Sequence, residues 1–282
     1  MNSNKRNKIL IGAVLILLLV FTVFAIIRSV KNYKTSKQGN IWLVENTRSA
    51  SQDYDGNTIS GSLILPSNDK KYGIEMAYSF WIYLDGWTDS QSSQSDDNVG
   101  NSQGLKHVFH KGDSIALPSQ SPGVWLQKVG TSVQLVVKMN TFHVSPACKE
   151  GDVSNESCYL EKCAINNIPV KKWVHVSVVV INTNIDVYVN GFLKKRCLLK
   201  GIPRLNQGSV YIAKISKFEG FSGMISRLKY YNYALPIWEI ERSVQEGPSS
   251  KIDQDILDIV PPYLSTNWWM GGRRQNRRTL RM

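Results

Sequence analysis

One uninterrupted apolar run near the N-terminus limits most strongly what this chain can form. Residues 9–27 read ILIGAVLILLLVFTVFAII, carry no charge, and include nothing more polar than Thr22. At the rise of an α-helix this run spans roughly 28 Å, close to the hydrocarbon thickness of a bilayer. A helix also satisfies its own backbone hydrogen bonds in lipid. The run therefore predicts one transmembrane helix over residues 9–27.

A cleaved secretory signal is the alternative, because a basic start followed by an apolar run fits both. This run is longer than the apolar core of a signal peptide, and it ends in Arg28-Ser29-Val30-Lys31 rather than in a small-residue cleavage site. We therefore expect an uncleaved anchor. Three basic residues precede the run and four follow it closely, so the positive-inside rule leaves the orientation open.

The formal net charge of +12 lies wholly in the two ends of the chain. Residues 1–37 hold seven basic side chains and residues 273–282 hold five, and neither stretch holds an Asp or Glu. The segment between them is formally neutral. This distribution excludes a basic nucleic-acid-binding domain, and contact of so short an arm with RNA or DNA would be unspecific.

Short apolar runs separated by Gly, Asn, Asp, Ser and Pro follow a polar linker over residues 28–39. Several runs alternate apolar and polar residues with period two and are rich in Val, Ile, Tyr and Trp, which is typical of β-strands. The expected strands cover residues 41–44, 59–65, 74–84, 105–109, 124–128, 133–139, 173–181, 186–189, 193–199, 209–215 and 223–231. So many strands at close spacing predict an all-β sandwich or barrel.

Two local signals support this arrangement. Asn190-Gly191 separates two apolar runs, and both positions of this dipeptide accept the positive φ of a two-residue hairpin turn. Residues 235–246 form the only helical pattern within the body, which Gly247-Pro248 ends. Residues 90–101 contain little to bury and are expected to form a loop.

The hairpin and its neighbours resemble a known superfamily. Residues 173–178, WVHVSV, and 186–191, DVYVNG, are similar to the W-x-H-V-A-V and L-Y-V-N-G signatures of the concanavalin A-like lectin/glucanase superfamily, in its laminin G-like branch. Residues 78–84, YSFWIYL, resemble an early core strand of that family. Residues 221–228 and 231–240 resemble its closing passage. The agreement in order covers about residues 40–247.

The resemblance implies a two-sheet antiparallel jelly-roll sandwich, preceded here by the transmembrane helix. It leaves function open, because this fold carries lectins, glycosidases, adhesion modules and structural domains. An anchor directly before such a domain, followed by a basic tail, is also similar in architecture to proteins of large DNA viruses of algae and protists, including minor components of their capsids.

No catalytic set is recognisable. Glycosidases need two facing carboxylates about 5–9 Å apart. The E-x-D-x-x-E strand pattern that active family members use is absent, and Glu239 and Glu241 lie in the expected helix, where neighbouring side chains point apart. His107 and His110 flank a strand near Asp113, while His175 lies on the 173–181 strand. Because no Ser or Cys elbow accompanies them, we interpret all three as core or surface histidines.

The sequence contains only weak evidence for a metal site. Asp85, Asp89, Asp96 and Asp97 offer oxygen ligands that could hold calcium, as in some laminin G-like relatives, but their spacing does not match an EF-hand loop. We therefore expect no cofactor.

The four cysteines contain no C-x-x-C pair, which argues against zinc. In an oxidising compartment they would form two disulfides that join an irregular loop to the 193–199 strand, and cytosolic free thiols are the alternative. These residues are Cys148, Cys158, Cys163 and Cys197. Asn155, in that loop, is a candidate glycosylation site.

The last segment of the chain, residues 248–282, combines paired tryptophans with arginines. Such a pattern suits docking into a partner's groove or into an anionic membrane interface, although the tryptophans could instead pack onto their own domain. The candidate partner-binding residues are Trp268, Trp269, Arg273, Arg274, Arg277 and Arg278.

The expected organisation has five parts: a basic segment (1–8), the transmembrane helix (9–27), a linker (28–39), the sandwich (40–247) and the basic tail (248–282). The leading functional hypothesis is a non-enzymatic minor virion protein that tethers an internal membrane to the capsid shell. The alternative is a cell-surface or lumenal glycan-binding lectin, with its site in the loops at residues 90–101 or 145–164. A membrane-bound glycosidase is a more distant third possibility.

Overall fold

The computed structural model describes residues 16–23, 39–67, 73–87, 104–116, 119–146, 148 and 158–253. The chain divides into two units, residues 1–40 and 41–282. In the first unit, residues 16–23 are helical and lie within the apolar run. The remainder of the predicted span 9–27 lies outside the described residues. Among the residues that are described, no helix has both the length and the apolar character needed to cross a membrane.

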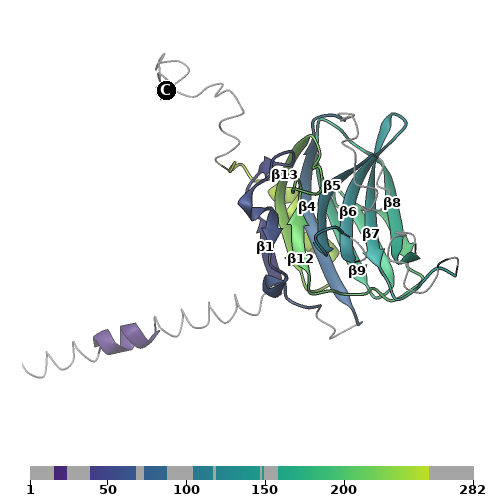
Figure 1. The fold of residues 1–282 in the computed structure, drawn as a ribbon. Helices are drawn as coiled ribbons and strands as arrows, with labels where there is room; N and C mark the ends of the chain where they lie inside the picture. Colours follow the sequence, from purple (N-terminus) through teal and green to yellow (C-terminus); the bar gives the residue numbers. More distant parts are fainter. Residues whose placement is uncertain are drawn as a thin grey trace, which may run out of the picture. The chain divides into compact units, whose positions relative to one another are not determined.

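The second unit is a two-sheet antiparallel sandwich, as the sequence predicts (Figure 1). In the described residues the first sheet has seven strands, of which β2 (Arg48–Ser49) pairs only with β13 at one edge. The order of the other six is β1 (Asn40–Val44), β13 (Gly223–Tyr231), β4 (Glu75–Leu84), β9 (Trp173–Ile181), β10 (Asn184–Val189) and β11 (Phe192–Leu198).

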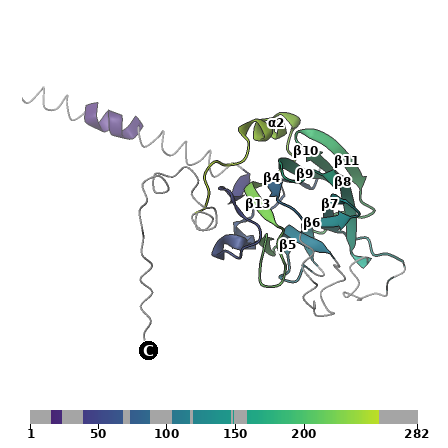
Figure 2. The same ribbon diagram turned by 90° about the horizontal axis from the view of Figure 1, so that it is seen from above.

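The second sheet has six strands in the described part of the chain. Their order is β3 (Thr58–Ile59), β12 (Ser209–Ile212), β5 (Leu105–Gly112), β6 (Gln120–Val129), β7 (Ser132–Asn140) and β8 (Leu160–Ile168). Figure 2 shows the two sheets as separate layers, with the helix α2 (Ile237–Glu246) beside the seven-stranded sheet.

The core lies between the sheets because each strand turns alternate side chains inward. On β4, Tyr78, Phe80 and Ile82 are fully buried, and the rings of Tyr78 and Phe80 pack on Phe109 of the opposite sheet at centroid distances of 5.0 and 5.4 Å. Every second residue of β9, beginning at Val174, joins the same cluster. The outward residues of β4 and β9 are also largely buried, so these two strands are packed on both faces.

The hairpin at Asn190-Gly191 forms as predicted. Val189 pairs with Phe192, and the two turn residues have φ angles of 50° and 86°. This is the backbone that a two-residue turn between twisted strands requires. The turn sets the first pairs between β10 and β11, and a register shift between Val187 and Tyr188 then brings Asp186 opposite Arg196.

Two expectations for local structure were wrong. Residues 59–65 do not form a strand. β3 ends at Ile59, and Ser60 caps a 3₁₀ turn (η2, Gly61–Leu63) by accepting a hydrogen bond from the backbone N–H of Ser62. Only glycine fits at position 61, because a Cβ there would lie 2.0 Å from the carbonyl oxygen of Gln207.

The second error concerns the segment that was expected to be an irregular loop before Trp173. Residues 160–168 form β8, the edge strand of the six-stranded sheet, paired with β7. Cys163 on β8 is joined to Cys197 on β11, and Cys148 is joined to Cys158. The first of these disulfides therefore connects the edge strands of the two sheets.

The described part of the predicted tail remains in contact with the sandwich. The backbone N–H of Asp253 donates to the carbonyl oxygen of Thr47, and Ile252 forms an isolated bridge with the same residue. The sandwich contacts therefore extend a few residues beyond position 247.

Candidate functional site

Aromatic side chains gather on the outer surface of the seven-stranded sheet. We call this surface the aromatic face, and it comprises Trp42, Trp81, Tyr83, Trp173, His175 and Tyr231. The pairing of β4 with β9 brings four of these rings together: Tyr83 lies opposite Trp173, and Trp81 lies opposite His175. The ring centroids of these two pairs are 5.6 and 5.1 Å apart. Trp42, on the edge strand β1, is 41% exposed.

Helix α2 covers one end of this surface. Its Ile240 is fully buried against Ala77, Val179 and Tyr231. Gly247 ends the helix with a φ of 68°. Beyond the helix, Tyr83 and Trp173 are half-buried, whereas Trp81 is only 8% exposed.

A small hollow lies between α2 and the rings. It is lined by Trp42, Trp81, His175 and Tyr231 of the aromatic face, with Ser79, Arg227, Lys229, Ser243 and Glu246. Its volume of about 10 Å³ is near the minimum that one water molecule needs. Arg227 donates to Glu246 at 2.8 Å, and this exposed ion pair forms part of the lining.

Two buried polar atoms at the hollow have no hydrogen-bond partner in the described structure. They are Nε1 of Trp81, a donor, and Nδ1 of His175. The other ring nitrogen of His175, Nε2, lies 2.8 Å from Oγ of Ser79. An unpaired buried polar atom is costly, so each of these positions favours a ligand or water that could complete the hydrogen bond.

His175, which lines the hollow, is neutral near pH 7 because it is buried. Burial lowers the pKa of His175 to about 4. Burial also lowers the pKa of Lys229, an effect that Glu239 and Glu246 partly offset. The Lys229 ammonium lies 4.6 Å from the ring centroid of Trp42 and 5.2 Å from that of Tyr231. These cation–π contacts hold the Trp42 ring against the sheet.

A second, larger cavity opens between the two sheets at one end of the sandwich. We call it the base pocket; Ile64, Leu65, Met76, Tyr78, Lys111 and Tyr230 are among the residues that line it. Its volume is about 580 Å³, within the range of roughly 300–1,000 Å³ that small-molecule sites occupy. Sequence reasoning missed this pocket, because its residues come from segments far apart in the chain.

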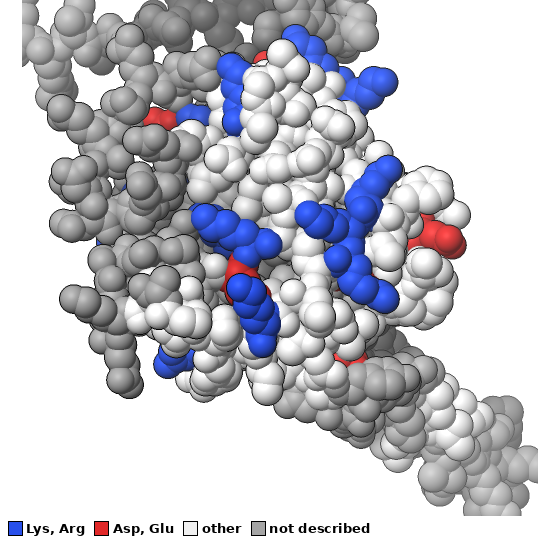
Figure 3. All heavy atoms as spheres, turned by 90° about the vertical axis from the view of Figure 1, so that its right-hand side faces the viewer, with Lys and Arg blue, Asp and Glu red and all other residues white. Residues whose placement is uncertain are grey.

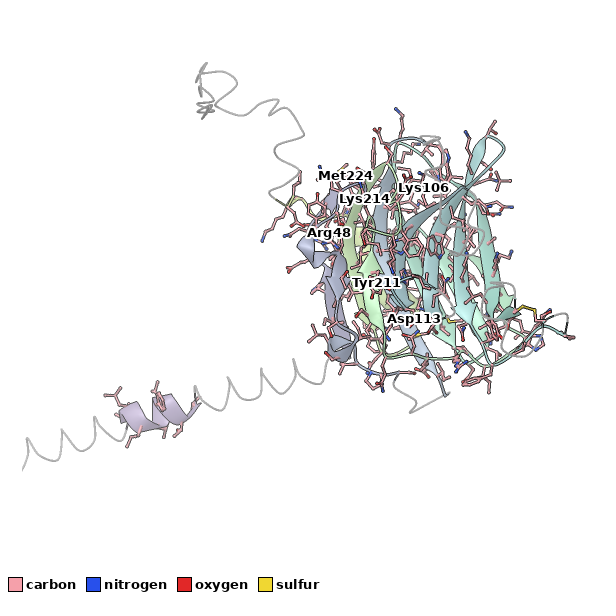
Figure 4. The ribbon with its side chains drawn as sticks, viewed as in Figure 1. Arg48, Lys106, Asp113, Tyr211, Lys214 and Met224 are labelled. Atoms are coloured by element: carbon pink, nitrogen blue, oxygen red, sulfur yellow. A yellow bond between two sulfur atoms is a disulfide. The ribbon has the colours of Figure 1, made fainter. Side chains whose placement is uncertain are left out.

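The remaining buried histidines form a cluster on the outer surface of the six-stranded sheet. His110 stacks on Tyr211 with centroids 4.9 Å apart, and its Nε2 lies 2.9 Å from the backbone carbonyl oxygen of Asp113. Tyr211 and Asp113 are labelled in Figure 4. Nδ1 of His107 lies 2.6 Å from the carbonyl oxygen of Ala213.

Carbonyl oxygens only accept, so Nδ1 of His107 and Nε2 of His110 must both carry hydrogen. The facing atoms, Nε2 of His107 and Nδ1 of His110, are 2.8 Å apart, and their hydrogen bond needs one further proton. Burial opposes that proton: it lowers the pKa of His107 well below its usual value and that of His110 to about 4. The outer nitrogen of each ring is bound to a backbone carbonyl oxygen and the rings are buried among aromatic side chains, so we interpret the pair as part of the packing.

The acidic residues that the sequence singled out do not converge. Glu239 and Glu241 both lie on α2, and Glu239 accepts a hydrogen bond from the Tyr233 hydroxyl at 2.9 Å. Asp85 is exposed, with Lys171 at 4.0 Å. Within the described ranges, no group of three His, Cys, Asp or Glu side chains is arranged to hold a metal ion.

Several candidate residues lie outside the described residues. They are Asp89, Asp96, Asp97, Asn155, Trp268, Trp269, Arg273, Arg274, Arg277 and Arg278. The same holds for residues 90–101, and for 147 and 149–157 within the second predicted lectin loop at residues 145–164. These remain predictions.

One side of the described surface is mainly basic (Figure 3). Figure 3 views the side of the molecule that lies at the right in Figure 1, and Lys and Arg predominate over Asp and Glu there. Lys194, Lys195 and Arg196 are exposed on the edge strand β11. Arg196 donates to both carboxylate oxygens of Asp186, each at 2.6 Å.

Taken together, the described strands define an antiparallel jelly-roll sandwich of two sheets. Residues 153–241 match the family model described as the concanavalin A-like lectin/glucanases superfamily, named Laminin_G_3. The resemblance to this superfamily is thereby confirmed over that part of the chain. No curated protein matches the chain significantly.

Solved structures of similar proteins include sugar- and receptor-binding domains. Domain 4 of AbnA, a GH43 extracellular arabinanase from Geobacillus stearothermophilus in complex with arabinotriose, is 16% identical at a TM-score of 0.39, covering 64% of this chain and 71% of that one. The botulinum neurotoxin type G receptor binding domain is 11% identical at a TM-score of 0.42, covering 75% of this chain.

The binding domain of botulinum neurotoxin DC in complex with SialylT is 14% identical at a TM-score of 0.38, covering 63% of this chain. This chain spans less than half of either neurotoxin domain, 37% of the DC domain and 47% of the type G domain. With such low scores, these likenesses carry no argument about function, and the family match applies to residues 153–241.

Proposed function

We propose that this chain is a membrane-anchored, non-enzymatic binding protein whose sandwich recognises carbohydrate through the aromatic face. One observation carries the proposal: half-buried rings on β4 and β9 and the exposed Trp42 flank a hollow in which two buried polar atoms lack partners. Aromatic rings stack on the apolar faces of sugars, and the unpartnered atoms suit hydroxyl groups, which both donate and accept. The apolar run at residues 9–27 would hold the domain at a membrane.

The small size of the hollow limits how a glycan could bind. At about 10 Å³ it admits no sugar ring. The ligand would therefore lie across Trp42, Tyr83 and Trp173 and place single hydroxyl groups over the hollow. The Arg227–Glu246 ion pair is partly exposed and so contributes little energy, and it can open to admit a larger group.

A glycan array probed with the full chain in detergent micelles tests this proposal. We expect binding that weakens about tenfold on Trp42→Ala and on Trp173→Ala, because losing one stacked ring costs about 1–1.5 kcal/mol. Trp238→Ala is the matched control: Trp238 is 57% exposed on α2 and does not line the hollow. Equal losses in all three variants, or no binding by the wild type, would refute the proposal.

The second candidate is a structural tether in a virion that joins an internal membrane to the protein shell. The observations that favour it are the two basic ends, with seven and five unbalanced positive charges, and the exposed basic residues of β11. Cross-linking mass spectrometry on purified particles would test it. Cross-links from residues 268–282 to a shell protein would support the tether, whereas absence of the chain from particles would exclude it.

Glycoside hydrolysis can be assayed in the same preparations. The carboxylates that the structure describes offer no facing pair on one sheet, so we expect no release of reducing sugar from β-glucans. Release that disappears on Glu239→Gln would instead make the chain a hydrolase.

A further inference from the structure

The base pocket contains a buried cation without a counter-ion. Lys111 lies near the end of β5 and is only 7% exposed. Its ammonium donates to the side-chain oxygen of Asn206 at 3.1 Å and to the backbone carbonyl oxygen of the same residue. Among the described residues, no carboxylate pairs with it.

An ammonium group has three donors, and the two acceptors from Asn206 are neutral. Burial lowers the pKa of Lys111 to about 8, so the side chain is still mostly protonated near pH 7. A buried charge without an opposite charge is costly, and an anion bound beside it would remove that cost.

A second buried polar group faces the same cavity without a partner. The Oη atom of Tyr78 has no hydrogen-bond partner in the described structure, although Tyr78 is fully buried. Its neighbour Tyr230 differs, because that hydroxyl donates to the carbonyl oxygen of Leu65 at 2.7 Å. The Tyr78 hydroxyl is therefore free to donate to a ligand.

Most of the remaining wall is apolar, although Ser62, Ser67, Ser121 and Gln207 also line the cavity. Met76 and Ile64 are buried in its wall, while Leu65 and Leu205 are each 41% exposed among the residues that line it. Near the cavity, the backbone of Gly208 packs directly on β5. A Cβ added at Gly208 would lie 2.3 Å from the carbonyl oxygen of Gly112. A mostly apolar chamber with one cation suits a ligand with an apolar body and an anionic end.

We propose that the base pocket binds an anionic amphiphile, an alkyl or acyl chain with a carboxylate or phosphate head, whose head pairs with Lys111 while its chain lies along Met76, Tyr78 and Tyr230. Such a molecule could come from a membrane lipid or from a soluble fatty acid. The site is separate from the aromatic face and independent of the glycan proposal.

Photo-cross-linking of the full chain in nanodiscs of neutral lipid tests this site. The probe is a long-chain carboxylic acid that carries a diazirine in its chain, and the comparator is the alcohol of the same chain. We expect peptides containing Met76 or Tyr230 to be labelled about tenfold more strongly by the acid, as a charge-assisted hydrogen bond requires. Mapping the labelled peptides by mass spectrometry separates this site from general partition into the lipid.

Lys111→Met is the decisive variant, since it keeps the length and removes the charge. It should reduce labelling by the acid to the level of the alcohol while its thermal unfolding temperature stays at or above that of the wild type. Tyr78→Phe, which removes only the hydroxyl group, provides a second variant and should reduce labelling several-fold. Equal labelling by acid and alcohol, or unchanged labelling of Lys111→Met, would overturn the proposal.

Competition identifies the source of the ligand. Displacement of the probe by phosphatidic acid built into the nanodisc indicates a membrane lipid, and displacement only by a soluble fatty acid indicates a soluble ligand. If neither competitor displaces the probe, the pocket does not select anionic amphiphiles and the proposal fails.

Discussion

Opening the Cys163–Cys197 disulfide should destabilise the sandwich more than opening Cys148–Cys158. The two bonds close loops of very different length, with sequence separations of 34 and 10 residues. In the chain-entropy model the closed loop lowers the entropy of the unfolded chain by an amount that grows with the logarithm of its length. This gives about 3.8 kcal/mol for the longer loop and about 2.7 kcal/mol for the shorter one at 25 °C.

Replacing cysteines alone would mix this effect with packing, because Cys163 is fully buried and Cys158 is nearly so. The cleaner comparison uses two variants that each retain one disulfide. Cys148→Ala/Cys158→Ala keeps the inter-sheet bond, and Cys163→Ala/Cys197→Ala keeps the loop bond. Reducing a variant changes nothing except the bond that it retains.

The assay is guanidinium unfolding of the full chain in detergent micelles, followed by tryptophan fluorescence with and without reductant. We expect reduction to lower the free energy of unfolding by about 3.8 kcal/mol in the first variant and about 2.7 kcal/mol in the second. A loss in the second variant that equals or exceeds that in the first would refute the loop-length reasoning.

Two further predictions follow from buried groups and backbone geometry. Since the pKa of His175 is about 4 in the folded chain and about 6.5 when unfolded, the unfolded state binds the extra proton between these values. The free energy of unfolding should therefore rise by about 3 kcal/mol from pH 4 to pH 6.5 through this residue, and His175→Gln should make that part of a stability–pH curve less steep. Gly191→Ala should cost about 1 kcal/mol in urea unfolding, because Gly191 has a φ of 86°. Gly86→Ala is the matched control, with nothing within 4 Å of the added Cβ, and an equal loss there would contradict the strain argument.

Most strands could be predicted because their inward residues form a strict period-two pattern. The boundaries of β9 and β13 agree with the prediction, and those of β4 differ by one residue. β8 was missed because its sequence, LEKCAINNI, lacks such a pattern, and Asn167 interrupts it with a φ of 60°. Its strand character comes from pairing with β7 and from the disulfide at Cys163, which are contacts distant in sequence.

The aromatic face could be predicted only in part. Period two places Trp81 and Tyr83 on one side of β4, and Trp173 and His175 on one side of β9. The sequence does not say that these two strands are neighbours, since almost ninety residues separate them. The base pocket was inaccessible to sequence reasoning for the same reason: Lys111 and Tyr78 belong to opposite sheets.

The two proposed sites use the same pair of strands from opposite sides. Tyr78 lines the base pocket while the next residue, Ser79, lines the hollow of the aromatic face. On β13, Tyr230 lines the pocket, whereas Lys229 and Tyr231 lie on either side of it in sequence and line the hollow. Successive side chains of a strand point to opposite faces of the sheet, so β4 and β13 line both sites with different side chains. Any energetic coupling between a glycan and an amphiphile would have to pass through the backbone of β4 and β13, and by linkage it would act equally in both directions.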